Sequence, residues 1–277
     1  MSRPVFFAQV SDFHIRPPGV IFADVVDTLA MLRAAVDTLV GFSPKLDAVL
    51  VSGDLTNDGE AEAYAQIAPE LARLPMPVYV VPGNHDHRER ITALAGVAEV
   101  GQGNAHRQFT AELGSLHLIA LDSLVEGEGH GALCAERLAW LETELERAAG
   151  RRILIMIHHP PAATGIDFMD RIGLRSSPAL DALIRRHAGS IERIVCGHVH
   201  RPIFYRWQGV PVSVTPGVAH QVVLGLDGRE PGFNLEPPGF HLHRWTETEG
   251  LVTHHVHLGS YPGPYYFSGN PDRKPAT

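Results

Sequence analysis

The sequence predicts an α/β fold with two stacked sheets flanked by helices. Short runs rich in Val, Ile, Leu and Phe alternate with helical patterns through the first two-thirds of the 277 residues. This alternation is typical of layered α/β domains. After His200 the chain consists of extended segments separated by tight turns, without an evident helix. That change indicates strands that are added late in the chain.

Six apolar runs in the first two-thirds are the expected strands. They are short and rich in β-branched and other apolar residues, as buried strands are. The runs are Val5–Val10, Ala48–Ser52, Val78–Val81, Leu116–Leu121, Ile153–Ile157 and Ile191–Cys196.

Apolar residues at steps of three and four predict helices between these strands. The clearest stripe runs from Val25 to Leu39, with Gly41 as its expected C-terminal cap. Two further stripes cover Leu138–Leu145 and Leu180–Ile184. A fourth, Tyr64–Leu74, contains Pro69, which we expect to kink or restart the helix.

The late segments predict an antiparallel sheet. Its expected strands are Ile203–Trp207, Val210–Thr215, Phe240–Trp245 and Leu251–Leu258. The Gly- and Pro-rich segment Gly225–Gly239 is interpreted as a surface loop. No repeat or linker divides the chain, so we expect one catalytic domain over residues 1–258, followed by an irregular tail over 259–277.

Composition excludes several classes of protein. The formal net charge is −8, so no surface suited to binding a nucleic-acid polymer is expected. The two cysteines, Cys134 and Cys196, do not indicate a disulfide framework, and Cys196 is interpreted as a buried core residue. There is no basic region followed by an apolar one at the start and no long apolar stretch, so we expect a cytoplasmic protein without a membrane span.

Five short motifs, each following an apolar run, carry acids, an amide and imidazoles. The carboxyl ends of strands in α/β sheets meet at one edge, where ligand sites collect. Asp12 and His14 stand two apart on a chain expected to be extended, so both side chains should project to the same side. The motifs are Asp12-Phe13-His14, Gly53-Asp54, Gly83-Asn84-His85-Asp86, His158-His159-Pro160 and Gly197-His198-Val199-His200.

These residue types indicate a site for two transition-metal ions. Carboxylate oxygen suits hard cations, whereas imidazole suits Zn, Fe, Ni and Cu, so the mixture points to metals of borderline softness. A carboxylate can bridge two ions about 3.5–4 Å apart, the spacing that polarises a phosphoryl group and holds a hydroxide for in-line attack. Fe, Mn, Zn and Co are all left open as the native metals.

The order and spacing of the motifs resemble the calcineurin-like metallophosphoesterases, and the resemblance implies their four-layer α-β-β-α sandwich of two mixed sheets. It also implies two metal sites that share Asp54 as a bridging ligand. The first site would consist of Asp12, His14, Asp54 and His200, and the second of Asp54, Asn84, His158 and His198.

The residues beside these ligands have separate expected roles. His85 is left facing the cleft, where it can donate a proton to a leaving alkoxide, so it is the candidate catalytic acid. His159 is expected to support the site or form a turn rather than bind metal. Asp86 is expected to orient a neighbour, in the way that carboxylates often fix metal-bound imidazoles.

Over nearly its whole length the chain is similar to bacterial glycerophosphodiesterases and class III cyclic nucleotide phosphodiesterases. The resemblance rests on the metal motifs and on Thr215–Gln221 and Tyr261–Tyr266. It implies a phosphodiesterase that hydrolyses small phosphodiesters, with Asn84, His85 and His220 as substrate contacts. The interpretation of His220 as a loop histidine without a functional role is equally well supported by the sequence. The expected pocket walls are Pro17–Asp24, Ser123–Gly131 and the late loops.

Few basic residues adjoin the motifs, only Arg88, Arg90 and Arg201, which favours diesters over monoesters. A phosphomonoesterase or nucleotidase of the same fold remains the main alternative, and a non-catalytic binding scaffold is the most distant one. The aromatic tail residues Tyr265, Tyr266 and Phe267 could pack against a second copy, so a homo-oligomer is expected.

Overall fold

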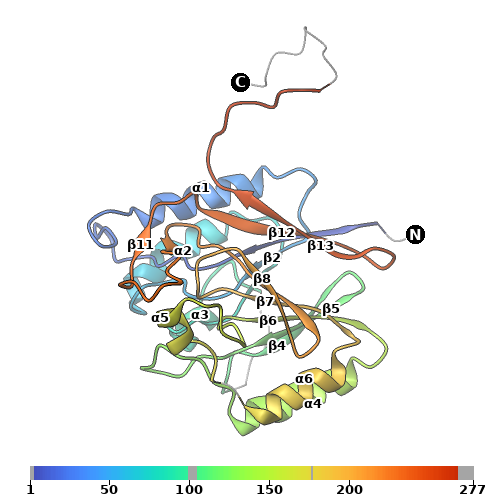
Figure 1. The fold of residues 1–277 in the computed structure, drawn as a ribbon. Helices are drawn as coiled ribbons and strands as arrows, with labels where there is room; N and C mark the ends of the chain where they lie inside the picture. Colours follow the sequence, from blue (N-terminus) through green and yellow to red (C-terminus); the bar gives the residue numbers. More distant parts are fainter. Residues whose placement is uncertain (1–2, 99–104, 176, 268–277) are drawn as a thin grey trace.

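The computed structural model describes residues 3–98, 105–175 and 177–267. Two β-sheets are stacked face to face, and helices cover the outer face of each sheet (Figure 1). The helices are α1 (Thr28–Val40), α2 (Ala61–Leu71), α3 (Arg88–Thr92), α4 (Ala135–Arg147), α5 (Asp167–Arg171) and α6 (Pro178–His187). The predicted four-layer α-β-β-α fold is confirmed.

The first sheet has the order β13-β12-β1-β2-β3. β1, β2 and β3 are parallel, whereas β12 pairs antiparallel with β1, and β13 antiparallel with β12, so the sheet is mixed. Its strands are β1 (Val5–Val10), β2 (Ala48–Val51), β3 (Val78–Val80), β12 (Gly239–Thr246) and β13 (Gly250–His257).

The second sheet has the order β4-β5-β6-β7-β9-β8 and is also mixed. β5, β6, β7 and β9 are parallel, and the edge strands β4 and β8 are antiparallel to their neighbours. Its strands are β4 (Phe109–Leu113), β5 (Leu116–Leu121), β6 (Arg152–Ile157), β7 (Ile191–Cys196), β8 (Ile203–Trp207) and β9 (Val210–Val214).

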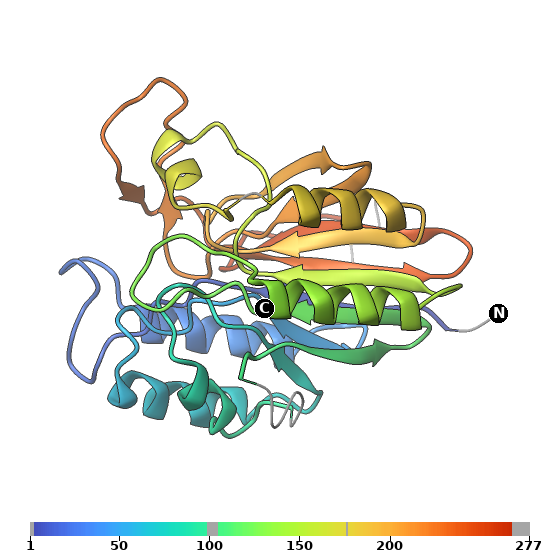
Figure 2. The same cartoon turned by 90° about the horizontal axis from the view of Figure 1, so that it is seen from below.

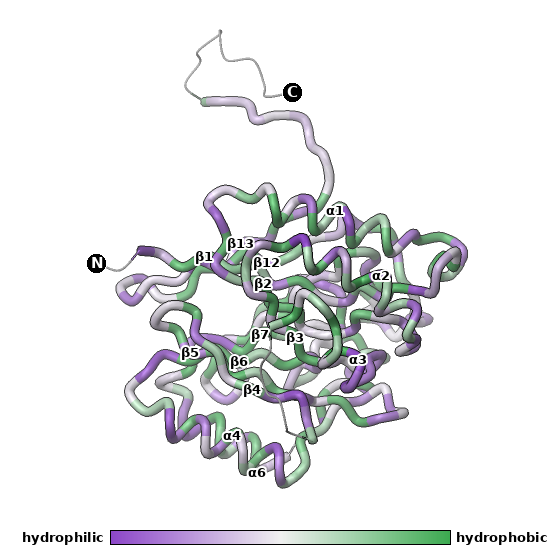
Figure 3. Tube along the Cα trace, turned by 180° about the vertical axis from the view of Figure 1, so that it is seen from behind, coloured by the Kyte–Doolittle hydropathy of each residue, from purple (hydrophilic) through white to green (hydrophobic). Residues whose placement is uncertain are grey.

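Three apolar layers hold the four structural layers together. The middle layer lies between the sheets and includes Phe7 and Met156, each fully buried. One outer layer packs α1 and α2 on the first sheet, and the other packs α4 and α6 on the second. Figure 2 shows α4 and α6 side by side, and Figure 3 shows hydrophobic residues concentrated on the central strands. Alternate residues of a strand face opposite layers, which explains the continuous apolar runs in the sequence.

Two predicted helix details differ from the structure. α1 begins at Thr28 rather than Val25, because the Asp27 side chain accepts a hydrogen bond from the Ala30 N–H at 3.0 Å and caps the helix. Val25 is 58% exposed and does not join the stripe. α2 runs through Pro69 and ends at Leu71, so the proline neither ends nor restarts the helix at its own position.

The prediction of one late antiparallel sheet is wrong. β8 and β9 extend the second sheet, with β9 parallel to β7, whereas β12 and β13 join the first. A further pair, β10 (Gln221–Val222) and β11 (Phe233–Asn234), forms a separate two-stranded ribbon, and β11 lies within the predicted surface loop Gly225–Gly239. The sequence prediction also omitted β4, α3 and α5, which are short elements.

The tail leaves the body of the molecule after β13 (Figure 1). Leu258 is buried, whereas Tyr261 and Tyr265 are exposed. Residues 268–277 of the predicted tail lie outside the described residues, and the division at residue 258 stays a prediction. None of the described helices combines the length and the apolar composition of a membrane span.

Candidate metal centre

The loops that follow five parallel strands converge and bring the seven predicted ligands together. β1 leads to Asp12 and His14, β2 to Asp54, β3 to Asn84, β6 to His158, and β7 to His198 and His200. All are buried except Asn84, which is half-buried. The two sheets are joined just beneath them, because the buried Gln9 side chain of β1 donates to the Cys196 carbonyl of β7 at 2.9 Å. That link fixes the two sets of loops against each other.

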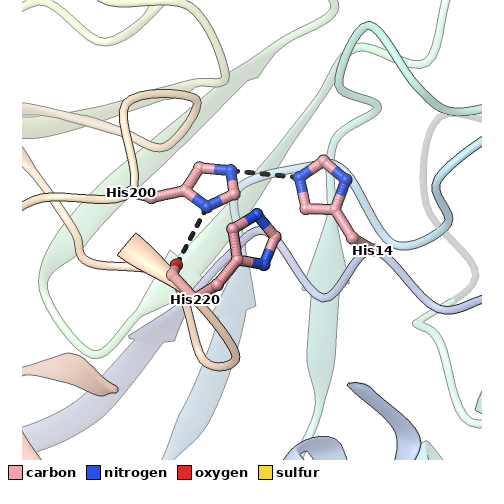
Figure 4. Close-up of side chains that lie close together, drawn as sticks. All are labelled: His14, His200 and His220. Atoms are coloured by element: carbon pink, nitrogen blue, oxygen red, sulfur yellow. Dashed lines mark hydrogen bonds between the residues drawn. The ribbon is translucent and has the colours of Figure 1, made fainter. Parts of the chain in front are cut away.

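Asp12, His14 and His200 form a first group of donors. His200 Nε2 lies 3.3 Å from Asp12 Oδ1 and 3.0 Å from His14 Nε2. His14 Nε2 lies in turn 3.7 Å from Asp54 Oδ2. Figure 4 shows the rings of His14 and His200 facing each other beside the ring of His220.

His158, Asn84 and His198 form a second group. His158 Nε2 lies 3.3 Å from Asp54 Oδ2 and 3.3 Å from Asn84 Oδ1. Asn84 Oδ1 also lies 3.0 Å from His198 Nδ1. A single carboxylate oxygen, Asp54 Oδ2, therefore stands at the junction of the two groups.

Backbone carbonyls orient three of the imidazoles. The Nδ1–H of His158 donates to the Ser52 carbonyl at 2.7 Å, and the Nδ1–H of His200 donates to the His220 carbonyl at 3.1 Å. The Nδ1–H of His85 donates to the Asn57 carbonyl at 2.6 Å. In His158 and His200, Nε2 is consequently the nitrogen that faces the carboxylates. When the ring nitrogen that does not bind metal donates such a hydrogen bond, it fixes the tautomer and ring plane of a metal-binding histidine.

The chain that carries Asp12 and His14 is not extended, contrary to the prediction. Their φ angles are 59° and 48°, and Asp54, His198 and His200 also have left-handed backbone, with φ between 51° and 71°. Left-handed residues other than glycine are uncommon, and Asp, Asn and His are the types that occur there most readily. The loops after β1, β2 and β7 turn sharply at these donors, and this turn, rather than strand alternation, aims their side chains.

Two glycines leave room for these donors. A Cβ atom at Gly83 would lie 2.1 Å from Asp54 Oδ1, and one at Gly53 would lie 2.4 Å from His158 Nδ1. Neither position can hold a side chain unless Asp54 or His158 moves. The glycines of the motifs thus permit close approach of the loops.

The buried charges of the centre depend on one another. Burial opposes ionisation of Asp12, but His200 and His158 outweigh it and lower the pKa of that carboxyl to about 2. Burial likewise opposes protonation of His158, but Asp54 outweighs it and raises the pKa of His158 to about 9. His198 is buried beside His158, and both effects lower its pKa to about 3.

The arrangement fits transition-metal ions. Several sets of three donors, among them Asp12–Asp54–His158 and His14–His200–His220, have ligand atoms within 4.8 Å of one another. His198 Nε2 is buried and has no hydrogen-bond partner within the described part of the chain. Two buried carboxylates and crowded imidazole nitrogens are stabilised when cations lie between them.

A cavity of about 330 Å³ opens beside the donors. Its lining includes His85, His220 and the aromatic residues Phe22 and Phe233. The His220 ring stacks on Phe22, with centroids 4.4 Å apart and planes at 17°, and burial and His200 lower its pKa to about 3. His220 therefore lies on the pocket wall as a neutral ring, and its carbonyl holds His200.

His159 and Asp86 support the loops of the centre. His159 is buried, with Nδ1 2.8 Å from Ser123 Oγ and Nε2 3.2 Å from the Gly129 carbonyl, so it connects the centre to the 123–131 loop. Asp86 orients neighbouring groups as expected, but these are backbone N–H groups and not an imidazole. Its carboxylate accepts from the N–H groups of Leu55 and Gly83, because the two loops leave those groups unpaired at its position.

Sequence reasoning missed several residues that shape the site. The Tyr64 hydroxyl, which projects from α2, donates to Asp86 at 2.8 Å. The sequence prediction treated this tyrosine only as part of an apolar helical stripe. Phe22 lies within the predicted wall Pro17–Asp24, but Phe233 was assigned to a surface loop. Neither aromatic residue forms part of a motif, so spacing gave no signal for it.

Residues 7–202 match the family described as calcineurin-like phosphoesterase. The chain belongs to this family. A protein of Arcobacter nitrofigilis named "Probable glycerophosphodiester phosphodiesterase GpdQ" is 35% identical over 94% of this chain and 95% of its own. The 3',5'-cyclic adenosine monophosphate phosphodiesterase CpdA of Escherichia coli is 28% identical over 90% of this chain and 88% of its own. The crystal structure of a dimetal phosphatase from Danio rerio has the same fold, with a TM-score of 0.61 at 16% identity over 92% of this chain and 99% of its own.

Proposed function

We propose that this calcineurin-like phosphoesterase is a binuclear metal-dependent phosphodiesterase that acts on small phosphodiesters. The observation that carries the proposal is the position of Asp54 Oδ2, which lies 3.7 Å from His14 Nε2 and 3.3 Å from His158 Nε2. One oxygen shared by two donor groups suits two ions at bridging distance. The names of the relatives, a glycerophosphodiesterase and a cyclic nucleotide phosphodiesterase, support the substrate class.

Asp12, His14, Asp54 and His200 would hold one ion, and Asp54, Asn84, His158 and His198 the other. When bound, the two ions supply Lewis acidity that polarises the phosphoryl group and acidifies a water molecule. Fe, Mn, Zn and Co all suit this mixture of carboxylate, amide and imidazole donors. All seven donors are present and converge, which favours an enzyme over a non-catalytic scaffold.

His85 would act as the general acid. Its Nδ1–H is held by the Asn57 carbonyl at 2.6 Å, and the ring lines the cavity, so Nε2–H is the group available to a leaving oxygen. The His85 N–H also donates to Asp54 Oδ1 at 2.9 Å, which fixes the loop that carries the ring. Asn84 and His220 would contact the substrate from either side of this position.

The cavity favours a diester over a monoester. Among the described residues, neither Arg nor Lys lines it, so a second phosphate charge would meet no cationic side chain. Phe22 and Phe233 form an apolar wall on which the second ester arm can lie, with centroids 5.3 Å apart. Such a wall can pack against an uncharged organic group but offers no hydrogen bond or opposite charge to an ionised oxygen.

The test compares bis-nitrophenyl phosphate with nitrophenyl phosphate on protein loaded with Mn²⁺ or Co²⁺. The expected result is a higher kcat/KM for the diester. A higher kcat/KM for the monoester would establish the phosphomonoesterase alternative instead. If neither substrate is turned over, the alternative of a non-catalytic binding scaffold is supported. A second panel of glycerophosphodiesters against 2',3'- and 3',5'-cyclic nucleotides then identifies the natural class.

We further propose a homo-oligomer in the cytoplasm. The support is the exposed aromatic tail, where Tyr265 is 77% exposed and Phe267 is fully exposed. Contiguous exposed aromatic residues are typical of contact surfaces. Light scattering on the full chain and on a variant that ends at residue 258 tests the assembly, and cell fractionation tests the location.

A further inference from the structure

A second group of metal-binding side chains lies outside the proposed catalytic centre. Cys134 is the residue before α4, Glu136 lies in the first turn of that helix, and His106 lies in the segment that leads to β4. His106 Nε2 is 3.8 Å from Cys134 Sγ and 3.8 Å from Glu136 Oε2. All three ligand atoms lie within 4.8 Å of one another.

We propose that Cys134, His106 and Glu136 form a separate site for a divalent transition-metal ion of the Zn²⁺ type. Ordinary Zn–S and Zn–N distances place neighbouring tetrahedral ligands about 3.3–3.6 Å apart. The two separations from His106 Nε2 therefore need to close by only a few tenths of an ångström. Sulfur, nitrogen and oxygen together suit Zn²⁺ and Co²⁺, and not Mg²⁺ or Ca²⁺.

The two segments that supply the ligands are held by one buried residue. The Arg107 N–H, next to His106, donates to Asp122 Oδ2 at 2.9 Å. The Arg137 guanidinium, in the first turn of α4, donates to the Asp122 carbonyl at 2.8 Å. Asp122 is fully buried, so His106 and the start of α4 keep their relative positions without a metal. Such preorganisation lowers the cost of binding.

Local charge is compatible with a divalent cation. The N–H groups at the start of α4 and the Arg137 guanidinium lower the pKa of the Cys134 thiol, which favours the thiolate that binds metal. These same groups repel a cation. One thiolate and one carboxylate neutralise a divalent ion, however, so the occupied site adds no net charge beside Arg137.

The second cysteine makes a site-specific test possible. Cys196 is fully buried, and burial raises the pKa of its thiol. Because the chain has only two cysteines, iodoacetamide should label only exposed Cys134 in the folded protein. The labelling rate, followed by peptide mass spectrometry, then reports on this site and is independent of turnover.

The experiment measures that rate on folded protein freed of metal and then supplied with Zn²⁺ or Mg²⁺. Zn²⁺ should slow labelling of Cys134 by about tenfold or more, because a metal-bound thiolate is a poorer nucleophile, whereas Mg²⁺ should not. His106→Ala should abolish the protection and Glu136→Gln should weaken it. His130→Ala, at a histidine four residues before Cys134 in the sequence that pairs with Glu128, is the control and should keep it.

A second measurement covers the case in which a variant is misfolded. Co²⁺-loaded protein should show a sulfur-to-cobalt charge-transfer band in the near ultraviolet, and Cys134→Ser should lack it. The seven proposed catalytic ligands include no sulfur, so occupancy of the catalytic centre cannot produce this band. Equal labelling with and without Zn²⁺, protection that survives in His106→Ala, or the absence of the band would overturn the proposal, whatever the phosphodiesterase assays show.

Discussion

At the scale of single residues, the proposed chemistry depends on how Asp54 and His85 are held. Asp54 uses both carboxylate oxygens, since Oδ1 accepts the His85 N–H and Oδ2 faces both donor groups. His85 is fixed at its backbone by Asp54 and at its ring by Asn57. The proposed acid and the proposed shared ligand are therefore held directly to each other.

Replacing Asp54 by Ala should remove both metal ions and lower kcat/KM by at least about 10³-fold, because two-ion charge stabilisation is lost. Asp12→Ala should deplete chiefly the ion held with His14 and His200. Metal analysis by mass spectrometry, together with turnover, checks both variants. Retention of two ions per chain in Asp54→Ala would disprove the shared position of this carboxylate.

Replacing His85 by Ala should slow esters of basic alcohols by about 10²–10⁴-fold, the usual worth of a positioned acid. Nitrophenyl esters should lose far less, because nitrophenolate leaves without a proton. The comparison is kcat on an alkyl and a nitrophenyl diester with the same metal-loaded variant. An equal loss on both substrates would indicate that His85 binds phosphate instead.

At the scale of elements, α1 and α2 cover the first sheet and are joined by a charge cluster around the buried Glu70. Glu70 of α2 accepts from Arg33 of α1 at 2.8 Å and from Arg73 at 2.7 Å. Burial opposes ionisation of Glu70, but the two arginines outweigh it and lower its pKa below the ordinary 4.5. The cluster links the two helices, and Arg73 also pairs with Asp37 of α1.

A lowered carboxyl pKa stabilises the fold above the unfolded-state pKa, and this stabilisation is lost as pH falls through the folded-state pKa. Glu70→Gln should therefore lower the free energy of unfolding at pH 7 by about 1 kcal/mol, since both arginines are partly exposed. The difference from wild type should shrink below pH 4.5, the ordinary value. Urea denaturation at several pH values measures it, and exposed Glu146→Gln should show no such trend.

At the scale of the whole molecule, the metal centre lies between two sheets that are joined beneath it by Gln9. Ions bound there would hold loops of both sheets together, since Asp12 and Asp54 follow strands of the first sheet and His158 and His200 follow strands of the second. Metal loading should therefore stabilise the contact between the sheets as well as the site.

Removal of metal by a chelator should lower Tm. An ion present at 100 to 1,000 times its Kd stabilises the native state by about 3–4 kcal/mol. Scanning calorimetry of loaded and chelated protein measures the shift, and Asp54→Ala should show a much smaller one. Identical Tm values for the two wild-type forms would contradict the proposed metal centre.

The fold was largely predictable because its strands are buried on both faces, and such strands read as unbroken apolar runs. β1, β5 and β7 were predicted to the residue. β10 and β11 have two residues each, too few to show any periodicity. The convergence of the seven proposed ligands could be predicted because each follows a strand, whereas their division into two metal sites came from the family resemblance and stays a prediction. The pairing of Phe22 with Phe233 could not, since it brings together loops about 200 residues apart that share no motif.

The left-handed backbone at Asp12, His14, Asp54, His198 and His200 has a consequence for how the protein can vary. Conformations of this kind cost on the order of 1–3 kcal/mol for residues other than glycine, and most for β-branched ones. A library randomised at these positions and selected for folded protein, without regard to activity, should return glycine and asparagine beside the native types and exclude valine and isoleucine. The chain would then tolerate loss of the chemistry more readily than a change in the shape of the turns.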